Sequence, residues 1–215
     1  MKKLIPVGII MVLSYLIPLF IRPDLLVYTR LHIVMLAGLV LLFFQPPLRL
    51  EDMERNQKTD KFSVLAILLG VILSQNIVLF DWAFLQDPPQ LEFNWSGWTI
   101  GGLILLVGGM VIRLAAIRQL GRYFTATVET QNSQQIVSDG LYGIVRHPSY
   151  LGAYLSMLGA ALMFSSWMGL IATAVIQILA YAYRINMEEE TLLSDLGDAY
   201  ERYAIRTKRM IPFVW

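Results

Sequence analysis

Long apolar stretches are the feature that most constrains what this sequence can fold into. Directly after Lys2 and Lys3 comes the run LIPVGIIMVLSYLIPLFI, and comparable runs recur along the chain. Runs of about 18 or more apolar residues are typical of membrane spans. In lipid the backbone must satisfy its own hydrogen bonds, which favours helices. The composition agrees, because 56% of the residues are hydrophobic and 15% are charged, against about 45–50% and about 25% in soluble domains. We therefore predict an all-α, polytopic membrane helical bundle.

The apolar runs divide the chain into predicted spans. The N-terminal run is too long for the apolar part of a signal peptide and no cleavage site follows it, so it is predicted as the first span. Further spans are predicted at 28–44, 62–85 and 98–117. Two shorter runs, at 150–164 and 167–183, are separated only by two serines. Their short length and close spacing favour a C-terminal helical hairpin over two independent crossings.

This order of elements predicts two domains. Residues 1–90 form an N-terminal part with three spans. Residues 91–215 form a core that contains the fourth span, a polar loop, the hairpin and a C-terminal amphipathic helix. In that last helix the side chains expected to face inward are Leu192, Leu193, Leu196, Tyr200 and Tyr203.

Lysine and arginine gather on one predicted side of the membrane. They follow the second and fourth spans and occur near both ends of the chain, whereas the loop QDPPQLEFNW after the third span contains none. Cytoplasmic segments of membrane proteins are enriched in these residues. We therefore expect a multi-pass integral membrane protein whose termini and polar C-terminal third face the cytoplasm.

The segment VRHPSY begins the hairpin and carries one of the two histidines of the chain. Proline suits the first turn of a helix, so His147 is expected to end a loop and Pro148 to begin the first hairpin helix at the membrane surface. Free backbone amides at such a helix start attract anionic groups. A simpler interpretation is that Arg146 and His147 are boundary residues whose polar ends reach the membrane interface.

A second polar cluster, RINMEEE, follows the hairpin. Arg184 and Glu188 are four residues apart and share one helix face. Arg184 also directly follows a largely apolar stretch, where a charge is costly and usually functional. An ordinary intrahelical ion pair is the alternative, although arginine before glutamate is the weaker order for such a pair. Because a tight hairpin brings its open ends together, we expect His147 and Arg184 to be neighbours at a cytosolic cofactor pocket.

The sequence argues against several other classes of site. The absence of cysteine removes thiolate ligands and cysteine nucleophiles. Two histidines and scattered carboxylates lack the spacing of a metal site. No G-x-G-x-x-G motif follows a strand, and a net charge of +1 provides no basic stripe for nucleic acid. The glycines of GGLILLVGG, in the fourth span, are interpreted as helix-packing positions.

The polar motifs together resemble a known family. The segments LGRYFTATV, IVSDGLYGIVRHPSYLG and RINMEEETLLSDLGDAYERYAIRTKRMIP are similar to those of isoprenylcysteine carboxyl methyltransferases, a family with prokaryotic-type members. The resemblance covers the C-terminal half of the chain. It implies a multi-helix membrane enzyme that takes a methyl group from S-adenosylmethionine (SAM) and releases S-adenosylhomocysteine. In eukaryotic members, the acceptor is the carboxylate of a prenylated cysteine.

The resemblance also implies roles for individual residues. Arg184 would hold the acceptor carboxylate, and Glu188 would act beside it at the catalytic centre and touch the cofactor. The other residues implied at the cofactor are Glu129, Gln134, Gln135, Ile136, Val137, Tyr142, Arg146, His147, Pro148, Ser149, Tyr150 and Glu189. Eukaryotic members carry glutamine and histidine where this chain has Glu129 and Gln134, and this difference leaves the exact acceptor open.

Methyl transfer to a carboxylate agrees with these residue types. The acceptor is already ionised at neutral pH, so the reaction needs positioning rather than a general base. A guanidinium can hold the carboxylate, and the ring faces of Tyr142 and Tyr150 can stabilise a sulfonium. A lipophilic acceptor would reach the site from the bilayer, among membrane lipids, while SAM would enter from the cytoplasm.

Three alternatives stay open at this point. A phospholipid amine or another small amphiphile is a second acceptor class, although Arg184 would repel an ammonium headgroup. An NADPH-dependent membrane reductase resembles this C-terminal architecture, but the glutamates at 188–190 disfavour a ligand with an additional phosphate. A non-enzymatic membrane protein would leave Arg184 and His147 as boundary charges.

Overall fold

The helical elements account for most of the chain that the structure describes. A computed structural model describes residues 13–16, 18–44, 62–86, 93–124 and 136–215. In chain order its elements are η1 (Pro23–Val27), α2 (Thr29–Phe43), α5 (Ser63–Phe80), η2 (Asp81–Leu85), α6 (Gly97–Leu120), η3 (Gly121–Tyr123), η4 (Gly140–Gly143), α7 (Pro148–Met163), α8 (Trp167–Leu196) and α9 (Asp198–Arg206). Within these ranges there is no strand, only an isolated bridge between Val145 and Lys208. The all-α prediction is confirmed.

Three helical segments are long and apolar enough to cross a membrane: Ser63–Leu85, Gly97–Tyr123 and Trp167–Leu196. They confirm the third and fourth predicted spans and the second arm of the hairpin. The predicted second span is also a helix, α2, but its 15 residues extend only about 22 Å, less than the hydrocarbon thickness of about 30 Å. Most of the predicted first span lies outside the described residues, and 13–16 and 18–21 within it are helical.

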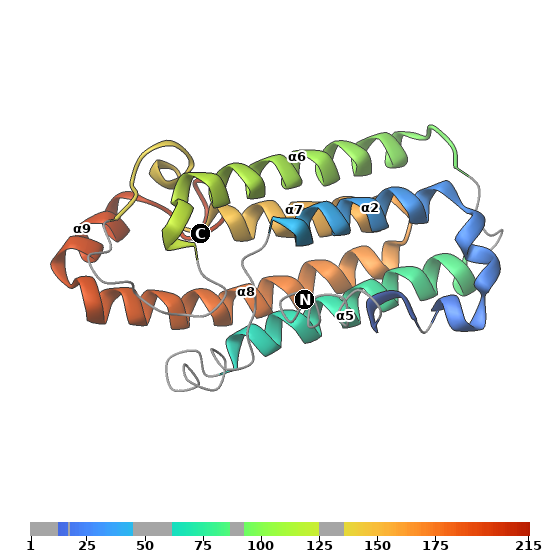
Figure 1. The fold of residues 1–215 in the computed structure, drawn as a ribbon, viewed down its shortest axis with the longest axis horizontal. Helices are drawn as coiled ribbons and strands as arrows, with labels where there is room; N and C mark the ends of the chain where they lie inside the picture. Colours follow the sequence, from blue (N-terminus) through green and yellow to red (C-terminus); the bar gives the residue numbers. More distant parts are fainter. Residues whose placement is uncertain (1–12, 17, 45–61, 87–92, 125–135) are drawn as a thin grey trace.

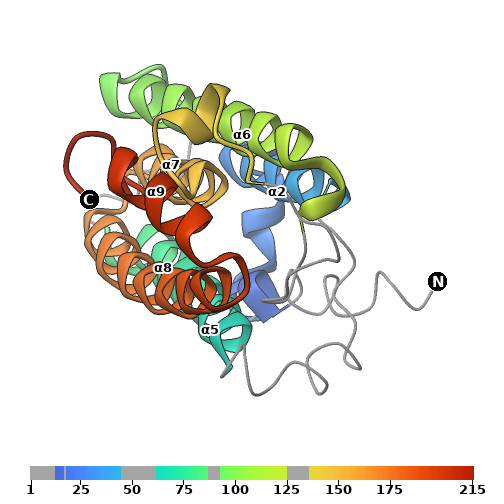
Figure 2. The same ribbon diagram turned by 90° about the vertical axis from the view of Figure 1, so that its left-hand side faces the viewer.

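The long helices pack as antiparallel neighbours, with α6 against α7 and α5 along α8 (Figure 1). This arrangement places the start of α5, the end of α6, the start of α7 and the C-terminal part of α8 at one end of the bundle, where α9 also lies (Figure 2). The opposite end holds a large apolar cluster, in which the rings of Trp82 and Phe164 are 4.7 Å apart. The two polar clusters predicted from the sequence therefore lie at the first end.

Glycines allow the backbones of α6 and α7 to approach closely. Gly102 and Gly109 of α6 face Gly159 and Gly152 of α7, respectively. A Cβ atom built at Gly109 would lie 2.5 Å from both the Gly152 carbonyl oxygen and the Ser156 amide nitrogen. No side chain other than hydrogen fits such a contact, which is typical of helix pairs in lipid. The interpretation of GGLILLVGG as a packing segment is confirmed.

The predicted hairpin is formed by α7 and α8, which are joined by the short link 164–166. Ser166 caps α8 by accepting a hydrogen bond from the Gly169 amide at 3.0 Å, and its hydroxyl donates to the Asp81 carboxylate. Because α8 has 30 residues, it is about 45 Å long. Its part beyond Arg184 therefore extends past the apolar segment, so the open end of the hairpin carries polar residues from both arms.

The C-terminal amphipathic helix differs from the prediction in one respect. α8 continues to Leu196, and the chain turns at Gly197, whose φ of 52° lies in the left-handed region. Tyr200 in α9 is buried and Tyr203 is half-buried, but Leu193 is 50% exposed. The prediction was wrong for Leu193 because the turn at Gly197 prevents residues before and after it from sharing one continuous helical face.

Candidate active site

The start of α7 is held in place by the C-terminal tail. The backbone amide of Arg146 donates to the Lys208 carbonyl at 2.8 Å, and that of His147 donates to the Arg209 carbonyl at 2.9 Å. His147 is buried and directly precedes α7, as the sequence predicts. The tail therefore fixes the backbone of the residue that carries the imidazole.

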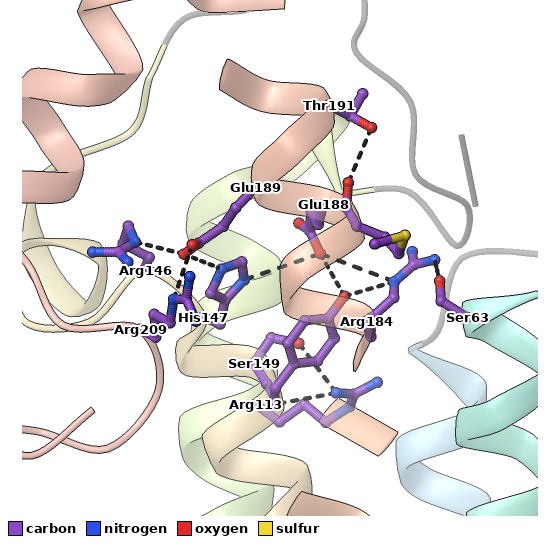
Figure 3. Close-up of polar contacts among 12 residues, drawn as sticks. Ser63, Arg113, Arg146, His147, Ser149, Arg184, Glu188, Glu189, Thr191 and Arg209 are labelled. Carbon is purple, nitrogen blue, oxygen red and sulfur yellow. Dashed lines mark hydrogen bonds and ion pairs between the residues drawn. The ribbon is translucent and has the colours of Figure 1, made fainter. Parts of the chain in front are cut away.

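Glu189 is the centre of a charged cluster that joins α8 to the start of α7 and to the tail (Figure 3). One of its carboxylate oxygens lies 2.7 Å from Arg146 Nε and 3.3 Å from His147 Nε2, and the other lies 3.0 Å from Arg209 Nε. Burial raises the pKa of Glu189, but the hydrogen bonds from His147 and Arg146 outweigh it and lower the pKa to about 2. Both carboxylate oxygens are thus occupied by side chains of the protein.

Glu188 joins the two clusters predicted from the sequence. Its Oε2 accepts a hydrogen bond from the Tyr150 hydroxyl at 2.7 Å and lies 4.0 Å from both His147 Nδ1 and Arg184 Nε. Arg184 Nε in turn donates to the Tyr150 hydroxyl at 3.2 Å. The predicted proximity of His147 and Arg184 is confirmed, because both approach the same carboxylate oxygen (Figure 3).

Three rings stack beside this carboxylate. The His147 and Tyr150 rings are 5.5 Å apart with an interplanar angle of 10°, and Tyr150 and Tyr181 are 5.3 Å apart at 18°. Tyr142, another predicted site residue, is also buried, and its hydroxyl donates to the Ala116 carbonyl at 3.3 Å. Polarisable aromatic rings therefore lie beside the carboxylate on which the polar groups converge.

Two contacts near the polar cluster were not predicted from the sequence. Arg113, which the sequence motifs did not single out, donates through Nη1 to the Ser149 carbonyl at 2.9 Å and to its hydroxyl at 3.1 Å. Ser63 accepts a hydrogen bond from Arg184 Nη1 at 2.9 Å. A charge within the fourth span, four residues after Gly109, is the signal in the sequence by which Arg113 could have been found. No comparable signal in the sequence pointed to Ser63.

The remaining predicted site residues are only partly described. Glu129, Gln134 and Gln135 lie outside the described residues. Ile136 and Val137 are half-buried and precede η4. Pro148 begins α7 and, like Ser149, is buried. Within residues 13–16, 18–44, 62–86, 93–124 and 136–215, no group of three His, Asp or Glu side chains could hold a metal ion.

The arrangement is suited to positioning charged groups rather than to attack by a side chain. Arg184 and His147 are nearly inaccessible, with side-chain exposures of 4% and 5%, whereas Glu188 keeps 29% of its side chain exposed. A fixed guanidinium, a partly open carboxylate and aromatic faces can orient two substrates for an in-line displacement. The chain contains no cysteine nucleophile.

Comparisons with known proteins give a consistent result. Residues 98–198 match the phospholipid methyltransferase family. The chain is 33% identical over 159 residues to protein-S-isoprenylcysteine O-methyltransferase B of Arabidopsis thaliana. This match covers 72% of this chain and 76% of the relative. It is 28% identical over 129 residues to the Homo sapiens protein-S-isoprenylcysteine O-methyltransferase, covering 59% and 45%, respectively.

A solved structure shares the fold. The structure of the eukaryotic intramembrane Ras methyltransferase, an isoprenylcysteine carboxyl methyltransferase, superposes with a TM-score of 0.58 at 21% sequence identity. The match covers 97% of this chain and 74% of that chain. The helices that carry the polar cluster are therefore arranged as part of a fold already seen in a membrane-embedded protein.

Proposed function

This chain belongs to the protein-S-isoprenylcysteine O-methyltransferase family and is an integral membrane methyltransferase, and we propose that it methylates the carboxylate of a prenylcysteine-like or other lipophilic acceptor with SAM as the donor. The observation that carries the proposal is the convergence of His147 and Arg184 on one carboxylate oxygen of Glu188. This geometry supports the proposal that an anionic acceptor and a cationic cofactor are held side by side here.

The residues present fit SAM chemically. The cofactor carries an ammonium and ribose hydroxyls, which a carboxylate such as Glu188 can bind, and a sulfonium, which aromatic faces attract. The stacked rings of His147, Tyr150 and Tyr181 provide such faces. When bound, SAM supplies the electrophilic methyl group. The residues proposed to hold it are Glu129, Gln134, Gln135, Ile136, Val137, Tyr142, His147, Pro148, Ser149, Tyr150 and Glu188.

Arg184 is proposed to hold the acceptor carboxylate. Its guanidinium is buried and fixed by hydrogen bonds at two nitrogens, Nε and Nη1. A planar guanidinium matches the geometry of a carboxylate. The acceptor is ionised at neutral pH, so no residue has to remove a proton before the methyl group is transferred.

Arg146 and Glu189 are proposed to support the cofactor site rather than to react. Glu189 binds His147 Nε2, so the imidazole keeps one ring orientation while its Nδ1 side faces Glu188. The Arg146 guanidinium also donates to the Ala204 carbonyl at 2.8 Å and thereby ties α9 to the start of α7. Loss of this cluster would release the tail that holds His147.

The topology proposed for the enzyme places the site on the cytoplasmic side, together with both termini. Arg118, Arg122, Arg146 and Arg184 all belong to segments that meet at the site end of the bundle. SAM would then enter from the cytoplasm, and the acceptor would enter laterally from the bilayer. The division into an N-terminal part at 1–90 and a methyltransferase core at 91–215 is part of the same proposal.

A second acceptor class is favoured by one observation, the match of residues 98–198 to the phospholipid methyltransferase family. A phospholipid amine would then be the methyl acceptor. Arg184 argues against it, because a buried guanidinium at the acceptor position repels an ammonium headgroup. The carboxylate is therefore the acceptor that the geometry supports best.

Calorimetry on the detergent-purified protein tests the cofactor part of the proposal. S-adenosylhomocysteine should bind, and His147→Ala or Glu188→Ala should weaken binding at least about tenfold, because each removes a polar contact at a buried centre. Glu190→Ala is the matched control, since it removes an exposed member of the same glutamate triplet. No heat with S-adenosylhomocysteine but clear heat with NADPH would instead identify the protein as a reductase.

A further inference from the structure

A row of buried polar side chains follows the contact between α5 and α8. Ser63 and Ser74 lie on α5, and Asp81 begins η2 directly after it. On the other side, Ser166 caps α8, and Thr173, Gln177 and Arg184 lie on α8. The α8 positions are separated by seven or four residues, so they share one helix face. Several pair across the two helices, because polar groups within lipid need partners. Ser166 donates to Asp81 at the end opposite the site, and Gln177 Nε2 donates to Ser74 Oγ at 3.2 Å in the middle.

At the site end of this row, the pair across the two helices includes a charged residue, Arg184. There Arg184 Nη1 donates to Ser63 Oγ at 2.9 Å, and both residues are buried. Ser63 is the first residue of α5. In Figure 3, Ser63 and Glu188 lie on different sides of Arg184. At the site end, the contact between α5 and α8 is therefore made by the guanidinium of Arg184, which is proposed to hold the acceptor carboxylate.

Ser63 and Tyr150 together restrict the orientation of this guanidinium. Tyr150 contacts Nε at 3.2 Å, and Ser63 contacts Nη1 at 2.9 Å. Since the group is planar, contacts at two of its nitrogens fix its rotation as well as its position. A misplacement of about 1 Å at a reacting group can lower a rate by about 10²-fold. The second contact therefore matters for the reaction although Ser63 itself is not placed at the reacting atoms.

We propose that Ser63 is a positioning residue, which orients Arg184 for the acceptor carboxylate and makes the start of the third span part of the acceptor side of the site. This inference rests on the function proposed above. Ser63 contacts Arg184, whereas the residues proposed to hold the cofactor lie at 129–150 and at Glu188. Removal of the Ser63 hydroxyl should therefore weaken binding of the acceptor and leave the affinity for the cofactor unchanged.

The position of Ser63 adds a consequence for specificity. The match to the phospholipid methyltransferase family begins at residue 98, so Ser63 lies in a span outside the region matched by that family. The residues proposed to hold the cofactor all lie within that region, whereas the proposed orientation of the acceptor group depends on an additional helix. Differences in α5 between relatives should therefore alter acceptor selectivity more than SAM binding.

Methylation kinetics with an S-farnesylcysteine derivative test this role. Ser63→Ala should raise the KM for the acceptor about tenfold, because a hydrogen bond to a charged group is lost, with an unchanged KM for SAM and unchanged affinity for S-adenosylhomocysteine. Ser63→Thr keeps the hydroxyl and should restore acceptor kinetics. Ser74→Ala is the matched control, since it removes another buried hydroxyl from the same face of α5, bonded to Gln177 rather than to Arg184.

Two outcomes would overturn the positioning role. In one, Ser63→Ala retains the wild-type KM for the acceptor. In the other, Ser63→Ala and Ser74→Ala change all kinetic constants equally, as a general loss of packing would. If Ser63→Ala does not fold, the nearly isosteric Ser63→Cys carries the test, because a thiol is a weak acceptor and the chain has no other cysteine. A wild-type protein that methylates no carboxylate would refute the proposed function itself.

Discussion

Replacing Gly109 with alanine should separate α6 from α7 and disturb the site at the same time. The added Cβ atom would lie 2.5 Å from the Gly152 carbonyl oxygen and the Ser156 amide nitrogen, whereas ordinary contacts begin at 3.4 Å. The two backbones must therefore move apart by about 1 Å, and overpacking of this kind costs about 1–3 kcal/mol. In a chain of this size, that corresponds to a decrease in Tm of roughly 2–12 °C.

The neighbouring glycine provides the control. A Cβ atom at Gly108 would have nothing within 4 Å, and alanine is the better helix former by up to about 1 kcal/mol. Gly108→Ala should therefore leave Tm unchanged or raise it slightly. The comparison is made by thermal unfolding of both variants in the same detergent. Equal Tm values for the two variants would refute the close approach of α6 and α7.

The same shift should reach the cofactor side of the site. Arg113 lies one helical turn beyond Gly109 and donates to the Ser149 carbonyl at 2.9 Å, so a separation of about 1 Å breaks this bond. Gly109→Ala should therefore also weaken binding of S-adenosylhomocysteine. Gly102→Ala introduces a comparable clash with Met163 at the far end of α7. It should lower Tm with a smaller effect on binding, and an equal effect on binding would contradict this local explanation.

Two further predictions concern the support of the site. Ser166→Ala removes the cap of α8 and the bond to Asp81, so it should lower stability by about 1–2 kcal/mol in thermal unfolding without changing S-adenosylhomocysteine affinity. The hydrogen bonds from His147 and Arg146 outweigh burial and lower the pKa of Glu189 from its ordinary value of 4.5 to about 2. Its charge therefore stabilises the fold above pH 4.5, and this contribution is lost as the pH falls towards 2. The Tm difference between wild type and Glu189→Gln should accordingly be largest at neutral pH and shrink below pH 4.5, and a constant difference would contradict the assignment.

The sequence predicts the elements of this site better than the contacts between them. Two short apolar runs separated by two serines predicted the hairpin. The hairpin alone was enough to predict that His147 and Arg184 lie close together. Helical periodicity identifies a buried face, but it does not say which residue of another helix meets that face. The bond between Arg184 and Ser63 joins residues 121 positions apart, so it depends on the relative rotation and height of two helices and leaves no local pattern.

The same limit explains the contacts made by the tail. The sequence predicts an amphipathic C-terminal helix, but the pairing of Arg146 and His147 with the backbone of Lys208 and Arg209 is made by carbonyl groups, which every residue type possesses. Glycine spacing was the exception, because only glycine fits where two backbones touch.

Methyl transfer by an Arg184→Ala variant is the most direct test of the central claim that this guanidinium holds the acceptor carboxylate. Wild-type protein should transfer labelled methyl groups from SAM to an S-farnesylcysteine derivative. Arg184→Ala should bind S-adenosylhomocysteine with wild-type affinity but lose at least about tenfold in kcat/KM for the acceptor, in keeping with a lost charge-assisted hydrogen bond. An Arg184→Ala variant that methylates the acceptor as well as the wild type would contradict the account.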